Sequence, residues 1–301
     1  MRRVLSFFLK LLLVLLLAAA GFLGYVYYSV NGRLAKTYTV VAPQVAISSD
    51  AESVARGKYL VTKVSMCIEC HGDDLGGKAF ADSAAFMRLW ASNLTTGRGG
   101  IGATYTDEDF VRALTHGVRK DGHSVVFMPS QDYHFTERDV AAIIAYVRSV
   151  PAVDRETPPP QLGPVVRVLS TVGNFPLLPA EMIDHANRTF VEEKDRTDPV
   201  AAGDYLVSSA GCRGCHGQDL VGGGGPPPGA GNITPVGIGD WTEADFKRAL
   251  REGKRPNGTT LSLEMPRAFG TMSDEDLSKI FAYLKTVPPK GQKTKNQMKA
   301  S

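Results

Sequence analysis

The sequence contains little cysteine, carries little net charge and has only one long apolar stretch. Only 4 of its 301 residues are cysteine, which excludes the disulfide-dense scaffold of small secreted proteins. The formal net charge is +3, so charge alone gives no argument for a nucleic-acid partner, and we expect none. Apolar residues make up 43% of the chain, yet only one uncharged stretch is both long enough and apolar enough to cross a bilayer, which excludes a multi-pass membrane protein. The length fits about two domains of ordinary size.

The one long apolar stretch lies near the N-terminus. Residues 11–30 carry no charge, and a helix of about 20 residues spans roughly 30 Å, the thickness of the hydrocarbon core. Arg2 and Arg3 precede this stretch and should stay cytoplasmic, which sends the rest of the chain across the membrane. We therefore predict an anchor at 1–30 that spans a bacterial inner membrane once, with the remainder in the periplasm. The alternative is a cleaved signal peptide, because Ala18–Ala20 resembles a small-residue cleavage site.

The rest of the chain contains one sequence pattern twice. Gly57-Lys58-Tyr59-Leu60-Val61 matches Gly203-Asp204-Tyr205-Leu206-Val207, and Asn93-Leu94-Thr95 matches Asn232-Ile233-Thr234. Further landmark pairs follow in the same order, so two tandem copies of one domain explain the pattern better than chance. The predicted parts are an anchor at 1–30, a first domain at 51–151, a proline-rich linker at 152–197, a second domain at 198–288 and a disordered polar tail at 289–301.

Each copy shows signals for the same three helices. Thr or Ser followed by Asp three residues later is a helix-start signal, because the hydroxyl caps a free N–H and the acid favours the positive helix end. This signal occurs at Thr106 and Thr136 in the first copy and at Thr242 and Ser273 in the second. We therefore predict an all-α fold in each copy. The first helix of each copy is expected at about 51–66 and 199–210, directly before the cysteines.

The four cysteines form two identical motifs. Cys67-Ile68-Glu69-Cys70-His71 and Cys212-Arg213-Gly214-Cys215-His216 both have the form C-x-x-C-H, the attachment signature of c-type haem. Two cysteines three residues apart on a helical turn can each form a thioether to a vinyl group, and the adjacent histidine can bind the iron. The sequence thus predicts two covalently bound haem c groups. The cysteines Cys67, Cys70, Cys212 and Cys215 would attach them, with His71 and His216 as axial ligands.

Two other chemistries use a C-x-x-C pair. A zinc site needs a second Cys or His pair nearby, but the second motif lies in the other copy, about 145 residues along the chain. A thioredoxin-like redox pair belongs to a βαβ pattern, which this sequence does not show. Both alternatives are therefore weaker than haem attachment.

The repeat also nominates a second axial ligand for each iron. Met128 and Met265 each precede a proline and lie between the second and third helices of their copies. A thioether is a soft ligand that suits haem iron and raises its reduction potential. The alternatives are that these methionines only fill the core, or that a histidine binds instead. The rival histidines, none of which has a counterpart in the other copy, are His116, His123, His134 and His185.

With these residues in place, both copies resemble class I cytochrome c domains. The second copy more narrowly resembles the cytochrome c subunits of membrane-bound periplasmic dehydrogenases for alcohols and gluconate. Its carrying residues are Asn232-Ile233-Thr234-Pro235, Gly237-Ile238-Gly239-Asp240-Trp241-Thr242, Asn257-Gly258 and Met265-Pro266. The resemblance implies that Tyr105 and Trp241 lie near the haem propionates, although either could serve only to pack a helix start. Those subunits usually carry three haem domains, and this chain has two, which puts the dehydrogenase partner in doubt.

The leading hypothesis for function is electron transfer without a catalytic residue. The protein would relay electrons from a dehydrogenase or a quinol-oxidising donor to an acceptor such as a terminal oxidase. One rival is a di-haem enzyme, either peroxidase-like or thiosulfate-oxidising, which needs an open or displaceable sixth position on one iron. A methionine in both copies argues against it. The second rival is a non-redox assembly or docking subunit of an oxidase, which two intact haem motifs make improbable as the sole role.

Overall fold

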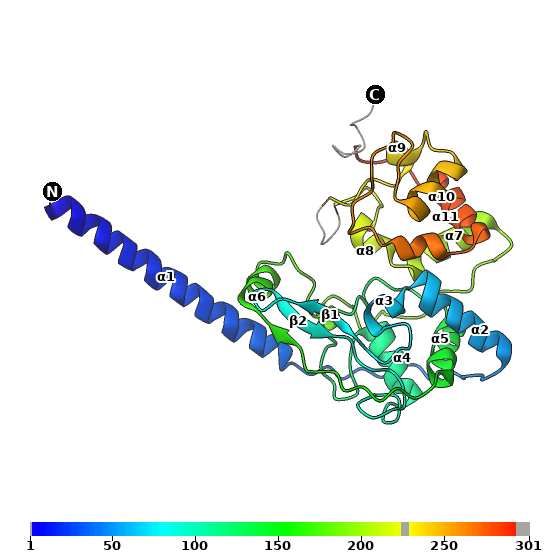
Figure 1. The fold of residues 1–301 in the computed structure, drawn as a ribbon, viewed down its shortest axis with the longest axis horizontal. Helices are drawn as coiled ribbons and strands as arrows, with labels where there is room; N and C mark the ends of the chain where they lie inside the picture. The colour runs from blue at the N-terminus through cyan, green and yellow to red at the C-terminus, as the bar shows by residue number, and fades with distance from the viewer. Residues whose placement is uncertain (1, 224–228, 293–301) are drawn as a thin grey trace.

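The computed structural model describes residues 2–223 and 229–292 and contains two helical domains beside one long helix (Figure 1). The predicted all-α class and the tandem order are confirmed. Residues 293–301 of the predicted polar tail lie outside the described residues. The first domain contains α2 (Ala51–Tyr59), η1 (Leu60–Val64), α3 (Cys67–His71), α4 (Asp107–His116) and α5 (Glu137–Ser149). The second contains α7 (Pro199–Ser209), α8 (Cys212–His216), α9 (Pro235–Ile238), α10 (Glu243–Glu252), η3 (Arg267–Thr271) and α11 (Asp274–Thr286).

The predicted anchor is a helix of 33 residues, α1 (Arg2–Leu34), that stands out from both domains (Figure 1). Among the described residues it is the one helix long and apolar enough to cross a membrane. It is longer than the predicted segment, and its last turns contact the body of the protein. Val26 and Val30 are fully buried there, although the apolar side chains nearer the N-terminus are exposed. The helix therefore has a free apolar part and a docked end.

The helix starts lie where the capping signals placed them. Thr106 accepts a hydrogen bond from the Asp109 backbone N–H while the Asp109 carboxylate accepts one from the Thr106 N–H, which is a complete capping box. Thr242 and Asp245 form the same box at α10. Thr136 and Ser273 cap α5 and α11 with their hydroxyls. These caps supply partners for N–H groups that a helix start leaves unpaired.

Each domain is built on one close crossing of its first and third helices. A Cβ at Gly57 would lie 1.8 Å from the Ala142 carbonyl oxygen, so α2 and α5 can approach this closely only because residue 57 is glycine. In the second domain a Cβ at Gly203 would lie 2.0 Å from the Lys279 carbonyl oxygen of α11. The first glycine pair of the sequence repeat is therefore the contact point of two equivalent helix pairs. The predicted first helix of domain 1 ends earlier as an α-helix and continues as the π-helical turn η1.

The segment predicted as a linker has structure of its own. It contains β3 (Gln161–Leu162), α6 (Pro164–Thr171) and η2 (Pro179–Glu181). β3 pairs with β2 (Met87–Trp90), which pairs with β1 (Ala79–Asp82), and both pairs are antiparallel. This segment packs along the first domain and against α1, with Val166 and Leu177 fully buried.

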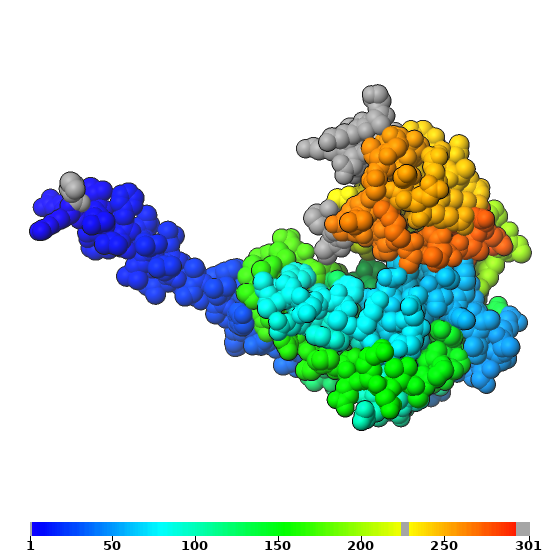
Figure 2. Space-filling model, in the orientation of Figure 1, coloured from blue at the N-terminus to red at the C-terminus, as the bar shows by residue number. Residues whose placement is uncertain are grey.

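One apolar core extends through both domains. It includes Val61 and Ile144 of the first domain together with Val207 and Leu277 of the second. The space-filling view shows the second domain lying directly on the first (Figure 2). The two domains therefore share buried surface instead of being joined only by the chain.

Candidate functional site

The two C-x-x-C-H motifs each form one short helix, α3 and α8, bounded by left-handed residues. The residue before the first cysteine has a positive φ in both, 50° at Met66 and 70° at Gly211. Residues three and four apart lie on the same face of a helix. Each motif therefore presents its two cysteines and its histidine on one face, as the predicted attachment of one haem per motif requires.

Both motif histidines are held in the same way. Nδ1 of His71 lies 2.8 Å from the Ser92 carbonyl oxygen, and Nδ1 of His216 lies 2.7 Å from the Gly231 carbonyl oxygen. A carbonyl oxygen can only accept, so Nδ1 carries the proton and Nε2 keeps its lone pair. Burial lowers the pKa of both histidines, although the carbonyl contact opposes this, and keeps the rings neutral. A neutral imidazole with Nε2 free is the form that binds haem iron.

A buried asparagine follows each of these carbonyls. The Asn93 side chain accepts from the Thr95 N–H at 2.9 Å and donates to the Val153 carbonyl oxygen at 2.7 Å. The Asn232 side chain accepts from the Thr234 N–H at 2.9 Å and donates to the Lys290 carbonyl oxygen at 2.8 Å. Each asparagine thus fixes the loop that holds the histidine to the chain after the third helix. Our sequence interpretation used the Asn-x-Thr pairs as repeat landmarks and as part of the family resemblance, and it missed this role.

The cysteines lie in an environment that does not suit a redox-active thiol pair. Burial, with a smaller effect of Cys70, raises the pKa of the Cys67 thiol to about 12. Burial, with a smaller effect of Cys215, likewise raises the pKa of the Cys212 thiol to about 12. Reactive C-x-x-C cysteines have a lowered pKa. No group of three His, Cys, Asp or Glu side chains that could hold a metal ion occurs within 2–223 and 229–292. The donor set therefore fits covalent haem c better than either alternative.

The two methionines occupy equivalent loops. Met128 and Met265 are both half-buried and pack against the core cluster that Cys67 and Cys212 also contact. Phe127, directly before Met128, has φ 60°, a conformation that costs a residue with a Cβ roughly 1–2 kcal/mol. Its N–H donates to the Leu177 carbonyl oxygen at 2.8 Å and its ring stacks on Phe175 at 5.0 Å. The segment between the domains therefore holds the Met128 loop in place.

The two aromatic residues lie at the starts of α4 and α10. Tyr105 is half-buried against Phe110, with ring centroids 5.5 Å apart, and its hydroxyl accepts from the Lys120 N–H at 3.4 Å. Trp241 is half-buried against the core cluster. Both positions also serve helix-start packing, and their contact with haem propionates stays a prediction.

Three of the four rival histidines lie where the first domain contacts the segment that follows it. His116 Nδ1 lies 3.2 Å from His185 Nδ1, and the ring of His134 contacts Arg188. Burial lowers the pKa of His116 to about 4 and that of His134 to about 4. His123 pairs with Thr37 through an isolated β-bridge.

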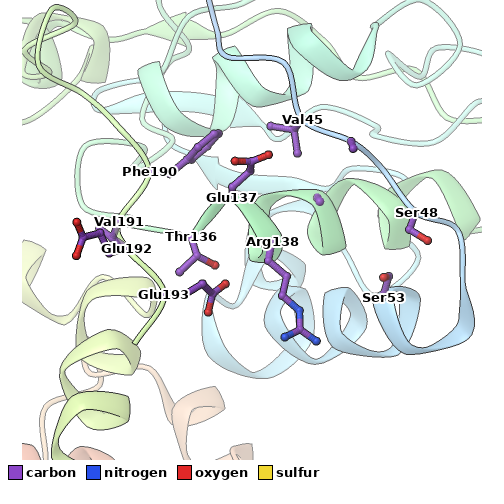
Figure 3. A pocket seen from close by; sticks show the side chains of 12 residues that line it. Val45, Ser48, Ser53, Thr136, Glu137, Arg138, Phe190, Val191, Glu192 and Glu193 are labelled. Atoms are coloured by element: carbon purple, nitrogen blue, oxygen red, sulfur yellow. The ribbon is translucent and has the colours of Figure 1, made fainter. Parts of the chain in front are cut away.

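A surface pocket of about 650 Å³ lies elsewhere, between α5 and the segments at 45–53 and 190–193 (Figure 3). Glu137, Arg138 and Glu193 are among its lining residues, and none of the haem-motif residues lines it. Three of its acidic side chains are exposed to solvent. The pocket is therefore separate from the C-x-x-C-H sites.

Comparison with known proteins matches these sites to a family. The family described as "Cytochrome C oxidase, cbb3-type, subunit III" matches residues 52–147 and 198–284. The "Fructose dehydrogenase cytochrome subunit" of Gluconobacter japonicus is 28% identical over 273 residues, which cover 81% of this chain and 54% of that protein. The "Alcohol dehydrogenase (quinone), cytochrome c subunit" of Gluconacetobacter polyoxogenes is 28% identical over 280 residues, covering 81% and 58%.

This chain covers a larger share of another, shorter relative. The "Diheme cytochrome c-type" protein of Cereibacter sphaeroides is 31% identical over 208 residues, covering 63% of this chain and 68% of that protein. Against the two dehydrogenase subunits, in contrast, this chain spans little more than half of the relative.

Proposed function

Because this chain belongs to the cytochrome c family described as cytochrome c oxidase, cbb3-type, subunit III, we propose that it is a membrane-anchored di-haem electron carrier. Cytochrome c domains imply covalently bound haem c, and the two matched segments each contain one C-x-x-C-H motif. Our proposal is therefore one haem in each domain. The chain itself would make and break no substrate bond.

The observation that carries this proposal is that both motif histidines are held by the same contacts. In each domain a backbone carbonyl takes the Nδ1 proton and a buried asparagine fixes the loop that bears that carbonyl. Such outer contacts set the tautomer and orientation of a metal-binding imidazole. A domain that had lost its cofactor would have no need to keep this arrangement.

Each domain would hold its haem with the same set of groups. Cys67 and Cys70 would attach one group, and His71 and Met128 would bind its iron. Cys212, Cys215, His216 and Met265 would do the same in the second domain. Haem c would supply a one-electron couple between ferrous and ferric iron, and a histidine and a methionine bound to each iron would leave no position for substrate. Tyr105 and Trp241 would line the propionate side.

The relatives suggest where the electrons come from. Relatives named as cytochrome subunits of fructose and alcohol dehydrogenases support a dehydrogenase or a quinol-oxidising donor, with redox protein subunits as partners. The proposed acceptor is a downstream carrier such as a terminal oxidase. The apolar part of α1 would lie in the inner membrane with both haem domains in the periplasm, because basic residues precede the apolar run.

The test is a haem count on the full chain, matured with its haem and extracted from membranes. We expect two haems per chain, two one-electron steps in a redox titration, and the near-red Met–iron charge-transfer band from both haems. One haem per chain would contradict the di-haem proposal. A missing band for one haem, together with binding of an external ligand to that iron, would favour the di-haem enzyme instead.

The proposed placement of the haem domains in the periplasm is tested by a separate experiment. Protease added to intact spheroplasts should remove both haem domains and leave the anchor in the membrane. Full protection of the haem domains would contradict the periplasmic placement.

A further inference from the structure

The two domains exchange hydrogen bonds reciprocally across their interface. The Tyr59 hydroxyl at the end of α2 donates to Asp276 Oδ2 at 2.6 Å and accepts from the Ser273 N–H at 3.0 Å. In the other direction, the Tyr205 hydroxyl of α7 donates to Asp139 Oδ2 at 2.6 Å and accepts from the Thr136 N–H at 3.3 Å.

These contacts have an approximate two-fold relation. Tyr59 and Tyr205 are equivalent in the repeat, and so are the capping residues at the starts of α5 and α11. The first helix of each domain therefore completes the start of the third helix in the other. A fixed relative orientation of the two domains follows from these paired contacts.

The chain segments that lead into both haem motifs meet at the centre of this interface. Ser65, two residues before Cys67, is buried and donates through Oγ to the Ser209 carbonyl oxygen at 2.9 Å. Ser209 lies three residues before Cys212 and is also buried. The backbone N–H of His134 donates to the Ser208 carbonyl oxygen at 3.3 Å. The interface thus brings the N-terminal ends of α3 and α8 together.

Tyr133 lies close to the chain that leads into both motifs. Its hydroxyl donates to the Ser65 carbonyl oxygen at 2.9 Å, and its electrostatic surroundings include the thiols of Cys67, Cys70 and Cys215. Burial, with these neighbours, holds the pKa of Tyr133 well above its ordinary value, so the phenol stays protonated. Thiols of both motifs therefore lie near the same tyrosine.

The neighbouring Asp132 rests directly on the second motif. A Cβ at Gly214, inside Cys212–His216, would lie 2.6 Å from an oxygen of the Asp132 carboxylate. A Cβ at Gly211 would lie 3.2 Å from the Tyr133 ring. The repeat places Phe269 and Gly270 opposite Asp132 and Tyr133, so this contact belongs to one domain only. Glu69, the counterpart of Gly214, is exposed.

From this arrangement we propose that Tyr133 and Asp132 join the two haem sites into one internal electron path. Tyr133 contacts the chain directly before both motifs, at Ser65 and at Gly211, and one electron would cross there. With a haem on each motif, the site that gives up the electron would be oxidised by one electron and the other site reduced by one. No bond forms or breaks and no proton leaves Tyr133. The inference rests on the proposed function, because it needs a haem on each motif.

The test is made on the full chain loaded with haem, with the haem count measured first for every variant. A photoreductant delivers one electron per chain, and its redistribution is followed through the difference spectrum of the two haems that a redox titration resolves. We expect an exchange phase whose rate does not depend on protein concentration. Tyr133→Leu should slow that phase severalfold and leave the two midpoint potentials nearly unchanged.

Two further variants separate the path from general damage. Gly214→Ala should also slow the exchange, because the added Cβ displaces Asp132, whereas Gly32→Ala, the same change at a glycine of α1 with open space around it, should not. If Tyr133→Leu folds poorly, Tyr133→Phe tests the same position. It keeps the ring and should retain most of the exchange rate. Two haems with exchange that is only bimolecular, or that is unchanged in Tyr133→Leu, would overturn the inference alone. Fewer than two haems in the unmodified chain would overturn the proposed function as well.

Discussion

At the scale of single residues, the buried asparagines Asn93 and Asn232 link the haem motifs to the rest of each domain. Both are fully buried. Replacing Asn93 by Ala leaves several buried partners without a hydrogen bond, at about 1–3 kcal/mol for each group left unpaired. We expect chemical denaturation of the haem-loaded protein to show a fall in the free energy of unfolding of that order or more. Asn187→Ala, at an exposed asparagine bonded to Asp184, is the matched control and should change it little.

The same replacement should also change one haem selectively. Loosening the Ser92 carbonyl weakens its hydrogen bond with His71 Nδ1, so the imidazole donates less electron density and the reduction potential rises. In a redox titration Asn93→Ala should raise one of the two potentials, and Asn232→Ala the other. Equal shifts of both potentials in either variant would contradict this role.

Asp139 is a second residue on which several parts depend. Its fully buried carboxylate lies 2.7 Å from Arg56 Nη2 and 3.2 Å from Arg196 Nη2, and it accepts from the Tyr205 hydroxyl. Burial alone would raise the pKa of Asp139, but the hydrogen bond and charge of Arg56, with Tyr205 and Arg196, outweigh it and lower the pKa. One carboxylate thus ties together α2, the segment between the domains, and domain 2.

A lowered folded-state pKa fixes the direction of the pH effect. The ion pair contributes stability above the unfolded pKa of Asp, about 3.9, and this contribution is lost as the pH falls through the folded pKa.

Asp139→Asn should cost about 3–5 kcal/mol at neutral pH, because Arg56 is left half-buried without its anion. The variant's unfolding free energy should also fall less steeply with acid. Asp82→Asn, in an exposed pair with Arg88, should cost about 0–1 kcal/mol. An Asp139→Asn cost as small as this would contradict the structure.

At the scale of elements, the helix crossings at Gly57 and Gly203 decide how each domain packs. An added methyl at Gly57 would overlap a carbonyl of α5, and backbone atoms cannot move away as a flexible side chain can. Overpacking of this kind costs about 1–3 kcal/mol or more, whereas the gain in helix propensity from glycine to alanine is only up to about 1 kcal/mol. Gly57→Ala and Gly203→Ala should therefore each destabilise the protein.

Thermal unfolding followed by circular dichroism measures this cost. Gly32→Ala, a helical glycine of α1 with open space around it, is the control and should not lower the midpoint. A stabilised Gly57→Ala variant would show that α2 and α5 do not cross at this glycine.

The elements that could be predicted are those whose causes lie within a few residues. The starts at Thr106, Thr136, Thr242 and Ser273 are set by a hydroxyl and an acid three residues later, so local sequence was enough. The short sheet was not predicted, because Met87 pairs with Leu162, far away along the chain. The loop that carries Ser92 was missed for a similar reason, since a backbone carbonyl has no sequence signature.

At the scale of the whole molecule, the long helix α1 is tied to the body of the protein. Arg33 forms an ion pair with Glu181 at 2.6 Å, and the Arg167 guanidinium lies 4.6 Å from the centre of the Tyr27 ring. Val30 is fully buried beside Val166 of α6. The end of α1 is therefore held by the segment between the domains, which also supports the Met128 loop. If α1 spans the membrane, the first domain has a fixed orientation to the bilayer.

The two domains should also unfold as one unit. Tandem domains that touch only through a linker unfold independently, but here one apolar core contains residues of both, and Tyr59 and Tyr205 bond across the interface. Calorimetry of the haem-loaded chain should therefore give a single transition. The double variant Tyr59→Phe/Tyr205→Phe removes two hydrogen bonds to carboxylates, worth about 1.5–3 kcal/mol each, and keeps both rings. It should broaden or split that transition, whereas Tyr28→Phe on the exposed side of α1 should leave it unchanged. Two separate transitions in the unmodified protein would mean that the interface does not couple the domains, and a split confined to the double variant would locate the coupling in these two hydroxyls.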